Sequence, residues 1–296
     1  MASNSARHRR RKITEGSQGS QGSKARQVGA PLIDLHTHTT ESDGRYAPGD
    51  LVTRARAAGV TVLAVTDHDT VSGCEAAAAA CAKAGMTFVT GIEITAMRDD
   101  HDVHVLGYFI DVSAPGLHSF LSEQRRRRID RLREMVAKLA ALGIRLDAEA
   151  ILRPAIEDPR KAAGRPWIAR ALVAGGHVAS TDEAFDRWLG QGRPAFVPRL
   201  GASPAEVIAR LHDANGIASL AHPGLVGHDE WIEGLISQGL DALEAYHSEH
   251  DSAATARYVA MASAMGIAVS GGSDFHGDPM HGPGQPGAVS LPGDAY

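Results

Sequence analysis

Histidine and carboxylate side chains recur in short clusters along this chain of 296 residues. The clusters include Asp34-Leu35-His36-Thr37-His38 and Ser273-Asp274-Phe275-His276. As candidate ligands we take His36, His38, Asp43, His68, Glu93, His104, His222, Asp274 and His276. Neutral imidazoles and carboxylates bind borderline and hard divalent cations, and no thiolate stands among these residues. The set therefore predicts a hydrolase site that holds several metal ions.

Apolar, strand-like runs lead directly into most of these clusters. Residues 61–66 (Thr-Val-Leu-Ala-Val-Thr) end at Asp67-His68, and residues 217–221 lead to His222. Helix-like stretches separate the runs, and this alternation predicts an α/β fold with a parallel sheet or barrel. Because a parallel barrel gathers its strand ends at one mouth, we expect a single shared site there.

A β-hairpin is predicted around the polar residues 98–102, which lie between two strand-like stretches. Folding the chain at the midpoint between Arg98 and Asp99 places Glu93 opposite His104. The Cβ atoms of directly opposed residues lie about 5 Å apart, so this pair can share an ion. Glu93 has two oxygens with which to bridge two metals, whereas His104 can bind one.

The strand-helix alternation stops after Ile110 and returns at Ser203. Residues 120–142 between them predict a long helix, because apolar side chains recur there at helical spacing. These are Ile129, Leu132, Val136 and Leu139. We therefore divide the chain into a basic, Gly/Ser/Gln-rich disordered tail (1–30), a barrel (31–112 and 201–296) and a mainly helical insertion that caps the site (113–200).

Composition narrows the range of partners. The formal net charge of −5 argues against a protein that coats long double-stranded nucleic acid. No apolar run is long enough to span a membrane, so we expect no membrane partner. Cys74 and Cys81 are expected to be free buried thiols in one helix, as in a cytoplasmic protein. The sequence leaves the oligomeric state open.

The order of the motifs resembles a known family. Asp-x-His-x-His followed by Asp43, then Thr-Asp-His-Asp, Gly-x-Glu, His-x-Leu-Gly-Tyr, Ala-His-Pro and Gly-Ser-Asp-x-His are similar to the PHP (polymerase and histidinol phosphatase) superfamily of metal-dependent phosphoesterases. The resemblance runs from Ile33 to about Gly277. Residues 164–166, 192–194 and 244–248 resemble the branch of nucleoside 3',5'-bisphosphate phosphatases that also trim short 5'-phosphorylated RNA.

This resemblance implies a distorted (β/α)7 TIM-like barrel that binds three divalent metal ions, with manganese expected first and iron or zinc as alternatives. Carried over by motif, one ion would take His36, His38, Glu93 and Asp274. A second would take Glu93, His104 and His222, and a third Asp43, His68 and His276. Trp167 departs from the family, where Arg-Pro-His is common after the glycine, and this puts the substrate preference in doubt.

Roles beyond the metal ligands are predicted for a few residues. Asp34, on the same strand face as His36, is better placed to orient an imidazole than to bind a metal. Asp67 and His247 are candidates for positioning or proton transfer, with support of the ligands as the alternative. A guanidinium can hold a second phosphate of the substrate, and we expect Arg165 and Arg193 to do so. The run 125–128 is interpreted as a solvated helix face.

The predicted reaction is hydrolysis of a phosphate monoester by metal-activated hydroxide. The expected substrate is a nucleoside 3',5'-bisphosphate or a short 5'-phosphorylated oligoribonucleotide. A phosphatase for a small metabolite such as histidinol phosphate is the first alternative. An inactive metal-binding scaffold and an amidohydrolase-type barrel are the others, although Glu93 occupies the place where the latter normally has a bridging lysine.

Overall fold

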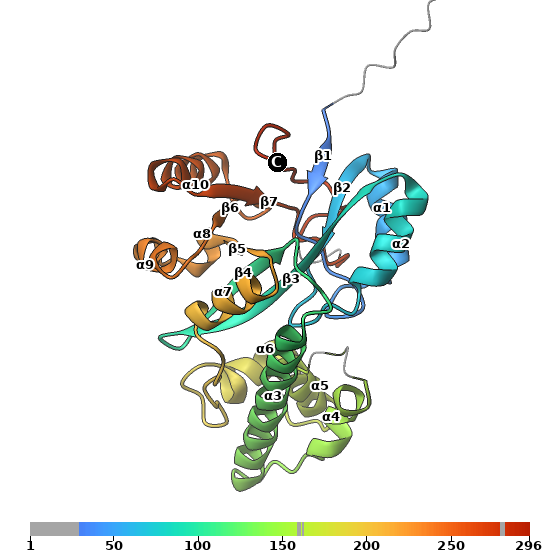
Figure 1. Cartoon of the computed structure of the whole chain (residues 1–296). Coiled ribbons are helices and arrows are strands. Elements are labelled where there is room, and N and C mark those ends of the chain that lie inside the picture. The colour runs from blue at the N-terminus through green and yellow to red at the C-terminus, as the bar shows by residue number, and fades with distance from the viewer. Residues whose placement is uncertain (1–29, 159–160, 162, 279–281) are drawn as a thin grey trace, which may run out of the picture.

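A seven-stranded sheet forms the centre of the molecule in the computed structural model, which describes residues 30–158, 161, 163–278 and 282–296 (Figure 1). The strands are β1 (Leu32–Asp34), β2 (Val60–Val65), β3 (Thr87–Arg98), β4 (His101–Tyr108), β5 (Ile217–Leu220), β6 (Ala242–Tyr246) and β7 (Ala268–Gly271). They pair in chain order. β4 is antiparallel to both neighbours, and the other pairs are parallel.

Hydrogen bonds from the chain after β1 to the end of β7 and the residues that follow it close the sheet. Leu35 N donates to Gly271 O at 3.2 Å, and His38 N donates to Phe275 O at 3.0 Å. Gly272 makes this approach possible, because a Cβ there would lie 2.3 Å from His36 N. The result is a distorted TIM-like barrel, as predicted.

Helices cover the outside of the barrel. They are α1 (Pro48–Ala57), α2 (Cys74–Ala84), α7 (Pro204–Asp213), α8 (Pro223–Val226), the 3₁₀ turn η2 (Asp229–Trp231), α9 (Ile232–Ser237) and α10 (Ser252–Met265). α2 packs on β3, α7 on β3 to β5, and α10 on β6 and β7. These contacts bury apolar side chains on both faces of the strands, so the strand ends have a rigid scaffold.

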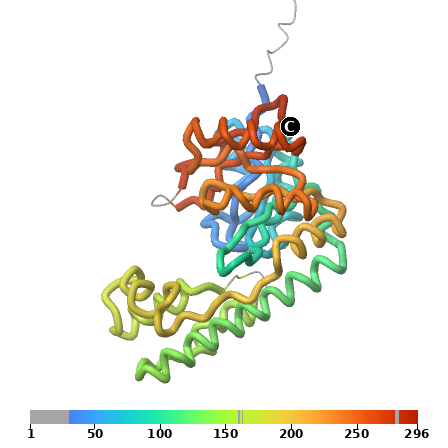
Figure 2. Tube along the Cα trace, turned by 90° about the vertical axis from the view of Figure 1, so that its left-hand side faces the viewer, coloured from blue at the N-terminus to red at the C-terminus, as the bar shows by residue number. Residues whose placement is uncertain are grey.

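A second layer of helices lies beyond one end of the barrel (Figure 2). It contains α3 (Pro115–Ala141), α4 (Ala148–Glu157), α5 (Arg165–Ala174), α6 (Thr181–Ala184) and the π-helical turn η1 (Phe185–Leu189). Along α3, Leu132, Val136 and Leu139 are buried and Ile129 is partly buried, as their spacing predicts. They belong to a core that residues 132–197 form among themselves. The predicted disordered tail lies outside the described residues, apart from Ala30.

The predicted register of the hairpin is wrong by two residues. Arg98 pairs with His101 as the last pair before the turn, and Glu93 therefore faces Leu106 rather than His104. Asp99 and Asp100 make a two-residue turn with φ angles of 49° and 63°, which is the tight connection that short hairpins favour. A shift of two preserves the side-chain face, so Glu93 and His104 still lie on the same side of the sheet.

The two cysteines of the chain lie in one helix. Cys74 and Cys81 are both buried in α2 and unpaired, as expected. Burial raises the pKa of each thiol to about 11, which keeps both unreactive near neutral pH. Across the described ranges, no helix combines the length and the apolar character that crossing a membrane requires.

Candidate metal centre

The predicted ligands converge at one end of the barrel. His36, His38 and Asp43 follow β1, His68 follows β2, Glu93 and His104 lie in β3 and β4, His222 follows β5, and Asp274 and His276 follow β7. Eight of these side chains lie within a few ångströms of one another in overlapping groups, and His222 joins them through Glu93. Residues separated by more than 200 positions in sequence therefore share one site.

One oxygen of Glu93 lies among three imidazoles. Oε2 is 3.3 Å from Nε2 of both His36 and His38, and 3.1 Å from Nδ1 of His68. The carboxylate is buried, which by itself raises its pKa, but its electrostatic interactions with the surrounding histidines outweigh burial and hold the pKa well below its usual range. Glu93 is therefore an anion at the centre of the cluster.

The other oxygen of Glu93 faces the far side of the cluster. Oε1 is 2.8 Å from Nδ1 of His104 and 3.2 Å from Nε2 of His222. The two oxygens thus address different histidines, so Glu93 is placed to bridge two ions. Glu93 and His104 are in contact although they are not directly opposite, because side chains of diagonal neighbours on one face of two paired strands can reach each other.

Asp274 supplies a second carboxylate to the first pair of histidines. Its Oδ1 lies 3.3 Å from Nε2 of His36 and 3.1 Å from Nε2 of His38. The charges of His36 and His38 and the hydrogen-bond contact with His247 overcome burial and lower the pKa of Asp274. His36, His38, Glu93 and Asp274 therefore form the first of the predicted ligand groups as a compact set.

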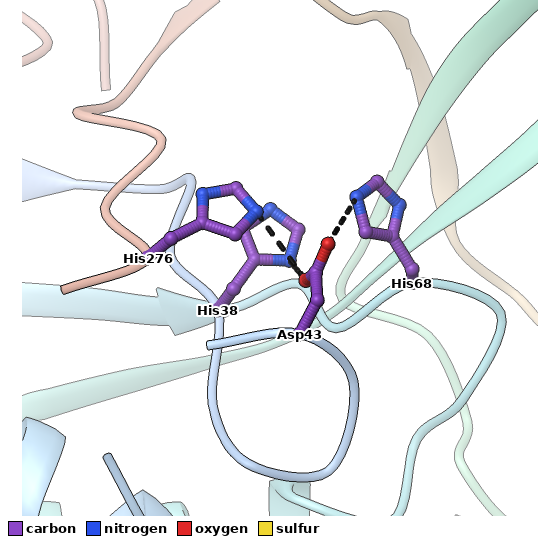
Figure 3. Close-up of side chains that lie close together, drawn as sticks. All are labelled: His38, Asp43, His68 and His276. Atoms are coloured by element: carbon purple, nitrogen blue, oxygen red, sulfur yellow. Dashed lines mark ion pairs between the residues drawn. The ribbon is translucent and has the colours of Figure 1, made fainter. Parts of the chain in front are cut away.

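Asp43 lies among three imidazoles, those of His38, His68 and His276 (Figure 3). Its Oδ2 is 3.7 Å from Nε2 of His68, and its Oδ1 is 3.3 Å from Nε2 of His276. The rings of His38 and His276 stack with their centroids 4.0 Å apart. The structure thus brings together all three members of the third predicted group and places His38 beside them.

Several buried polar atoms of the cluster make no hydrogen bond, and this fits a site that binds metal ions. Within the described residues, both ring nitrogens of His38, Nδ1 of His68, Nδ1 of His222 and Oδ1 of Asp274 make no hydrogen bond. Leaving such atoms unpaired is costly unless another group binds them. Two ligands of one ion, each about 2.1 Å from it, lie about 3.0–3.4 Å apart. Most nitrogen–oxygen separations around Glu93 and Asp274 fall in this range.

The imidazoles do not share one protonation state. Burial alone lowers the pKa of His38, but contacts with Asp274 and Glu93 and the charges of these carboxylates raise it to about 10. Burial lowers the pKa of His68 to about 4 despite the charges of Glu93 and Asp43. Near neutral pH the candidate ligand His68 is therefore neutral. At His38, a metal ion would have to displace a proton.

Glu244 supports the cluster from behind, and the sequence analysis missed it. Its Oε1 lies 2.8 Å from Nδ1 of His36, and its Oε2 accepts a hydrogen bond from His222 N at 2.8 Å. A carboxylate on the outer nitrogen of a ligand histidine fixes the ring orientation and raises its basicity. The sequence feature that could have indicated this role is the position of Glu244 in β6, three residues before His247.

Asp34 was expected to orient an imidazole, and the structure corrects this. The buried carboxylate accepts hydrogen bonds from Ser273 N at 2.8 Å, from Ser273 Oγ at 2.7 Å and from Gly287 N at 2.7 Å. It therefore fixes the backbone next to Asp274 and ties the C-terminal segment to β1.

Replacing Asp34 by asparagine is expected to destabilise the fold by about 1–3 kcal/mol, because the amide cannot accept all of these bonds. Thermal unfolding followed by circular dichroism measures the effect. Asp294→Asn, an exposed acid of the same segment, is the matched control. Equal melting temperatures for the two variants would show that Asp34 has no such role.

Asp67 and His247 occupy different positions relative to the ligands. Asp67 accepts hydrogen bonds from Thr39 N, Thr39 Oγ1 and Ser42 Oγ, each at 2.7 Å, and so holds the loop that carries Asp43. His247 directs Nε2 toward Asp274 Oδ2 at 3.4 Å. These contacts favour support of the ligands for Asp67, and proton transfer stays a prediction for His247.

The backbone is strained at several residues of the site. His222 has a φ of 28° and Asp274 a φ of 53°, and each comes just after a strand. Asp69, next to His68, has a φ of 52°. Non-glycine residues in this region cost free energy and cluster at functional sites. The site therefore stores strain that the barrel must hold in place.

A cavity of about 590 Å³ lies between the ligands and the helical layer. Asp43, His68 and His104 line one wall. The helical layer and the segment that leaves it contribute Arg128, Arg170, Arg199 and Trp167. Trp167, the departure from the family pattern, thus faces the space where a substrate would bind.

The arginines of this cavity differ from those expected. Arg165 lines a separate smaller cavity, and Arg193 is exposed. Arg128 belongs to the run interpreted as a solvated face, but its side chain is only 15% exposed and pairs with Asp69. The solvated interpretation is therefore wrong for Arg128, because a helix pattern does not show which turn meets the barrel. A phosphate-binding role for Arg165 and Arg193 stays a prediction.

Arg199 is also confined, with its side chain 23% exposed. Its Nη1 lies 3.4 Å from Asp102 Oδ2 but makes no hydrogen bond within the part of the chain that the structure describes. Burial lowers the pKa of Arg199, and the charge of Arg128 adds to this effect. The guanidinium of Arg199, with Nη1 free of hydrogen bonds and Arg128 nearby, forms a region that attracts anions.

Comparison with known proteins agrees with this geometry. The PHP domain family matches residues 34–169. The chain is 34% identical over 252 residues to a 3',5'-nucleoside bisphosphate phosphatase of Chromobacterium violaceum, covering 82% of this chain and 87% of the relative. It is 34% identical over 258 residues to a 5'-3' exoribonuclease of Haemophilus influenzae, covering 82% and 89%.

A solved structure shares the fold. The structure of an amidohydrolase from Chromobacterium violaceum with bound sulfate superposes with a TM-score of 0.73 at 32% identity, covering 88% of this chain and 91% of the other. Identity and coverage of this order, together with the converging histidines and carboxylates, establish that the chain is homologous to these proteins. The chain belongs to the PHP family of metal-dependent phosphoesterases, which hydrolyse phosphoester bonds.

Proposed function

We propose that this protein removes the 3'-phosphate of a nucleoside 3',5'-bisphosphate and also trims short 5'-phosphorylated oligoribonucleotides. The names of two relatives support these substrate classes. Both substrates carry a phosphate to be hydrolysed and a second, 5'-terminal phosphate that stays intact. A site for them needs two separate regions that attract phosphate.

The proposal rests on the lining of the cavity between the candidate ligands and the helical layer, which we call the main cavity. One wall consists of candidate metal ligands, and the facing residues include Arg128, Arg170 and Arg199. The volume of about 590 Å³ lies within the about 300–1,000 Å³ typical of small-molecule sites. Guanidiniums bind phosphate through paired, charge-assisted hydrogen bonds. A substrate with one phosphate at each end matches such a cavity better than a monophosphate does.

The residues present fit three divalent ions in the predicted groups, with manganese proposed first. His36, His38, Glu93 and Asp274 would hold one ion, Glu93, His104 and His222 another, and Asp43, His68 and His276 the third. When bound, such ions neutralise charge on the phosphoryl oxygens and lower the pKa of water.

The protein's own groups orient the reaction. Glu244 fixes the ring of His36 through Nδ1, and Asp34 fixes the backbone before Asp274. Arg199 and Arg128 would hold the second phosphate and so direct the scissile one toward the ligands. Nδ1 of His247 accepts a hydrogen bond from Glu249 N at 3.1 Å, which leaves Nε2 directed at the cluster.

Phosphate release with matched substrates tests the proposal. We expect adenosine 3',5'-bisphosphate to be hydrolysed with kcat/KM about 10²-fold above that of adenosine 3'-monophosphate, because only the former engages the arginines. Histidinol phosphate should give no release. Chelator-treated protein should lose activity and regain it with manganese. No turnover of the bisphosphate would refute the substrate, and purified protein free of manganese, iron and zinc would favour a scaffold.

A further inference from the structure

A second cavity, of about 480 Å³, also opens on the ligand cluster. Among the candidate ligands it is lined by Asp43, Asp274 and His276, whereas Asp43, His68 and His104 line the main cavity. Asp43 belongs to both linings. The cluster is therefore reached through two openings, and a substrate longer than one nucleotide can extend on both sides of it.

The two openings differ in charge. Four cations and two acids line the main cavity, namely Arg128, Lys161, Arg170 and Arg199 with Asp43 and Asp102. One cation and four acids line the second, namely Arg45 with Asp43, Glu249, Asp274 and Asp278. Arg45 Nη2 lies 3.2 Å from Asp278 Oδ1, so its charge is partly neutralised. A terminal phosphate is therefore attracted to the main cavity, and the second opening suits a group that carries little or no charge.

The side chains of the second opening match a nucleoside. Leu225, in α8, is 58% exposed there and offers an apolar surface to a base. Ser248 and Glu249, which follow β6, offer a hydroxyl and a carboxylate to ribose hydroxyls. Stacking or packing on the face of a base, combined with contacts to the 2'-hydroxyl, is how proteins bind single-stranded RNA. We call Arg45, Leu225, Ser248 and Glu249 the downstream groove.

We propose that the downstream groove binds the nucleoside joined through its 5'-oxygen to the scissile phosphate of a short oligoribonucleotide. This inference rests on the proposed function. In both substrates the oxygen of water bonds to phosphorus, the bond from phosphorus to the 3'-oxygen breaks, and that oxygen takes up a proton. The bisphosphate yields a nucleoside 5'-phosphate and inorganic phosphate, and leaves the groove empty. The oligonucleotide fills the groove and yields a nucleoside 5'-phosphate and a shortened 5'-phosphorylated chain.

Two variants at exposed positions test the groove. Leu225→Asp removes the apolar surface and adds a charge that repels the substrate, and Arg45→Gln removes the cation. For 5'-phosphorylated diadenylate we expect Leu225→Asp to lower kcat/KM about tenfold and Arg45→Gln to lower it about threefold. With adenosine 3',5'-bisphosphate both variants should stay within about twofold of the parent protein. Leu142→Asp, at an exposed position after α3, is the control and should change neither substrate.

Equal losses on both substrates, or no loss on either, would overturn the groove. Hydrolysis of the bisphosphate without any cleavage of the dinucleotide would also overturn it while leaving the proposed phosphatase intact. If neither substrate is hydrolysed, the proposed function fails and calorimetry decides the groove separately. A 5'-phosphorylated dinucleotide with a methylphosphonate link should then bind more tightly than adenosine 5'-phosphate, and Leu225→Asp should abolish the difference. No difference in the parent protein would reject the groove.

Discussion

Replacing Glu93 by glutamine is expected to lower kcat at least about 10³-fold, or about 4 kcal/mol of barrier. The two oxygens of Glu93 contact imidazoles on both sides of the cluster, so one substitution weakens two ion sites. The amide has one neutral oxygen for ligation and an NH₂ group that cannot bind a cation. Steady-state phosphate release measures the rate, and elemental analysis measures the metal content.

Glu233→Gln, an exposed acid of α9, is the matched control for charge and should retain full activity. Circular dichroism separates loss of the site from loss of the fold. Glu93→Gln with parent activity and parent metal content would show that this carboxylate bridges nothing, and the assignment of the first two ion sites would fail with it.

Replacing Arg199 by glutamine is expected to lower kcat/KM for adenosine 3',5'-bisphosphate about 10²-fold, since a desolvated cation facing a phosphate contributes several kcal/mol. The loss should fall to about threefold or less for adenosine 3'-monophosphate, which has no second phosphate to bind. Comparing the two substrates separates recognition of the second phosphate from damage to the metal centre.

Arg193→Gln serves as the control for this experiment and also tests the prediction from sequence. Arg193 is exposed, so we expect its removal to change kcat/KM by no more than about twofold for either substrate. A larger effect from Arg193 than from Arg199 would support the prediction from sequence and place the second phosphate outside the main cavity.

The convergence of the candidate ligands followed from the sequence because strand ends carry a local signal. When apolar strands of a barrel end in histidine or aspartate, these polar residues lie at one mouth of the barrel. The two residues of the turn at Asp99 and Asp100 set the register of the hairpin, and the midpoint of a polar run does not reveal them.

Residues that act across domains were not predictable in the same way. Arg128 lies in α3 at a spacing that suits solvent, and only the packing of the helical layer against the barrel turns it toward Asp69. Glu244 points into the barrel from a buried strand, where a lone acid gives no sign of its partner His36. Contacts of this kind depend on tertiary placement that periodicity does not encode.

The closure between β1 and β7 links the chemistry to the folding of the barrel. His36 and His38 lie on one side of this seam, Asp274 and His276 lie on the other, and Asp274 N donates to His36 O across it at 2.8 Å. Joining segments so distant in sequence costs loop entropy, and a cation held by both sides would repay part of that cost. Ion binding would thereby stabilise the contact between the first and last strands. We expect the ion-free protein to unfold locally along this contact first.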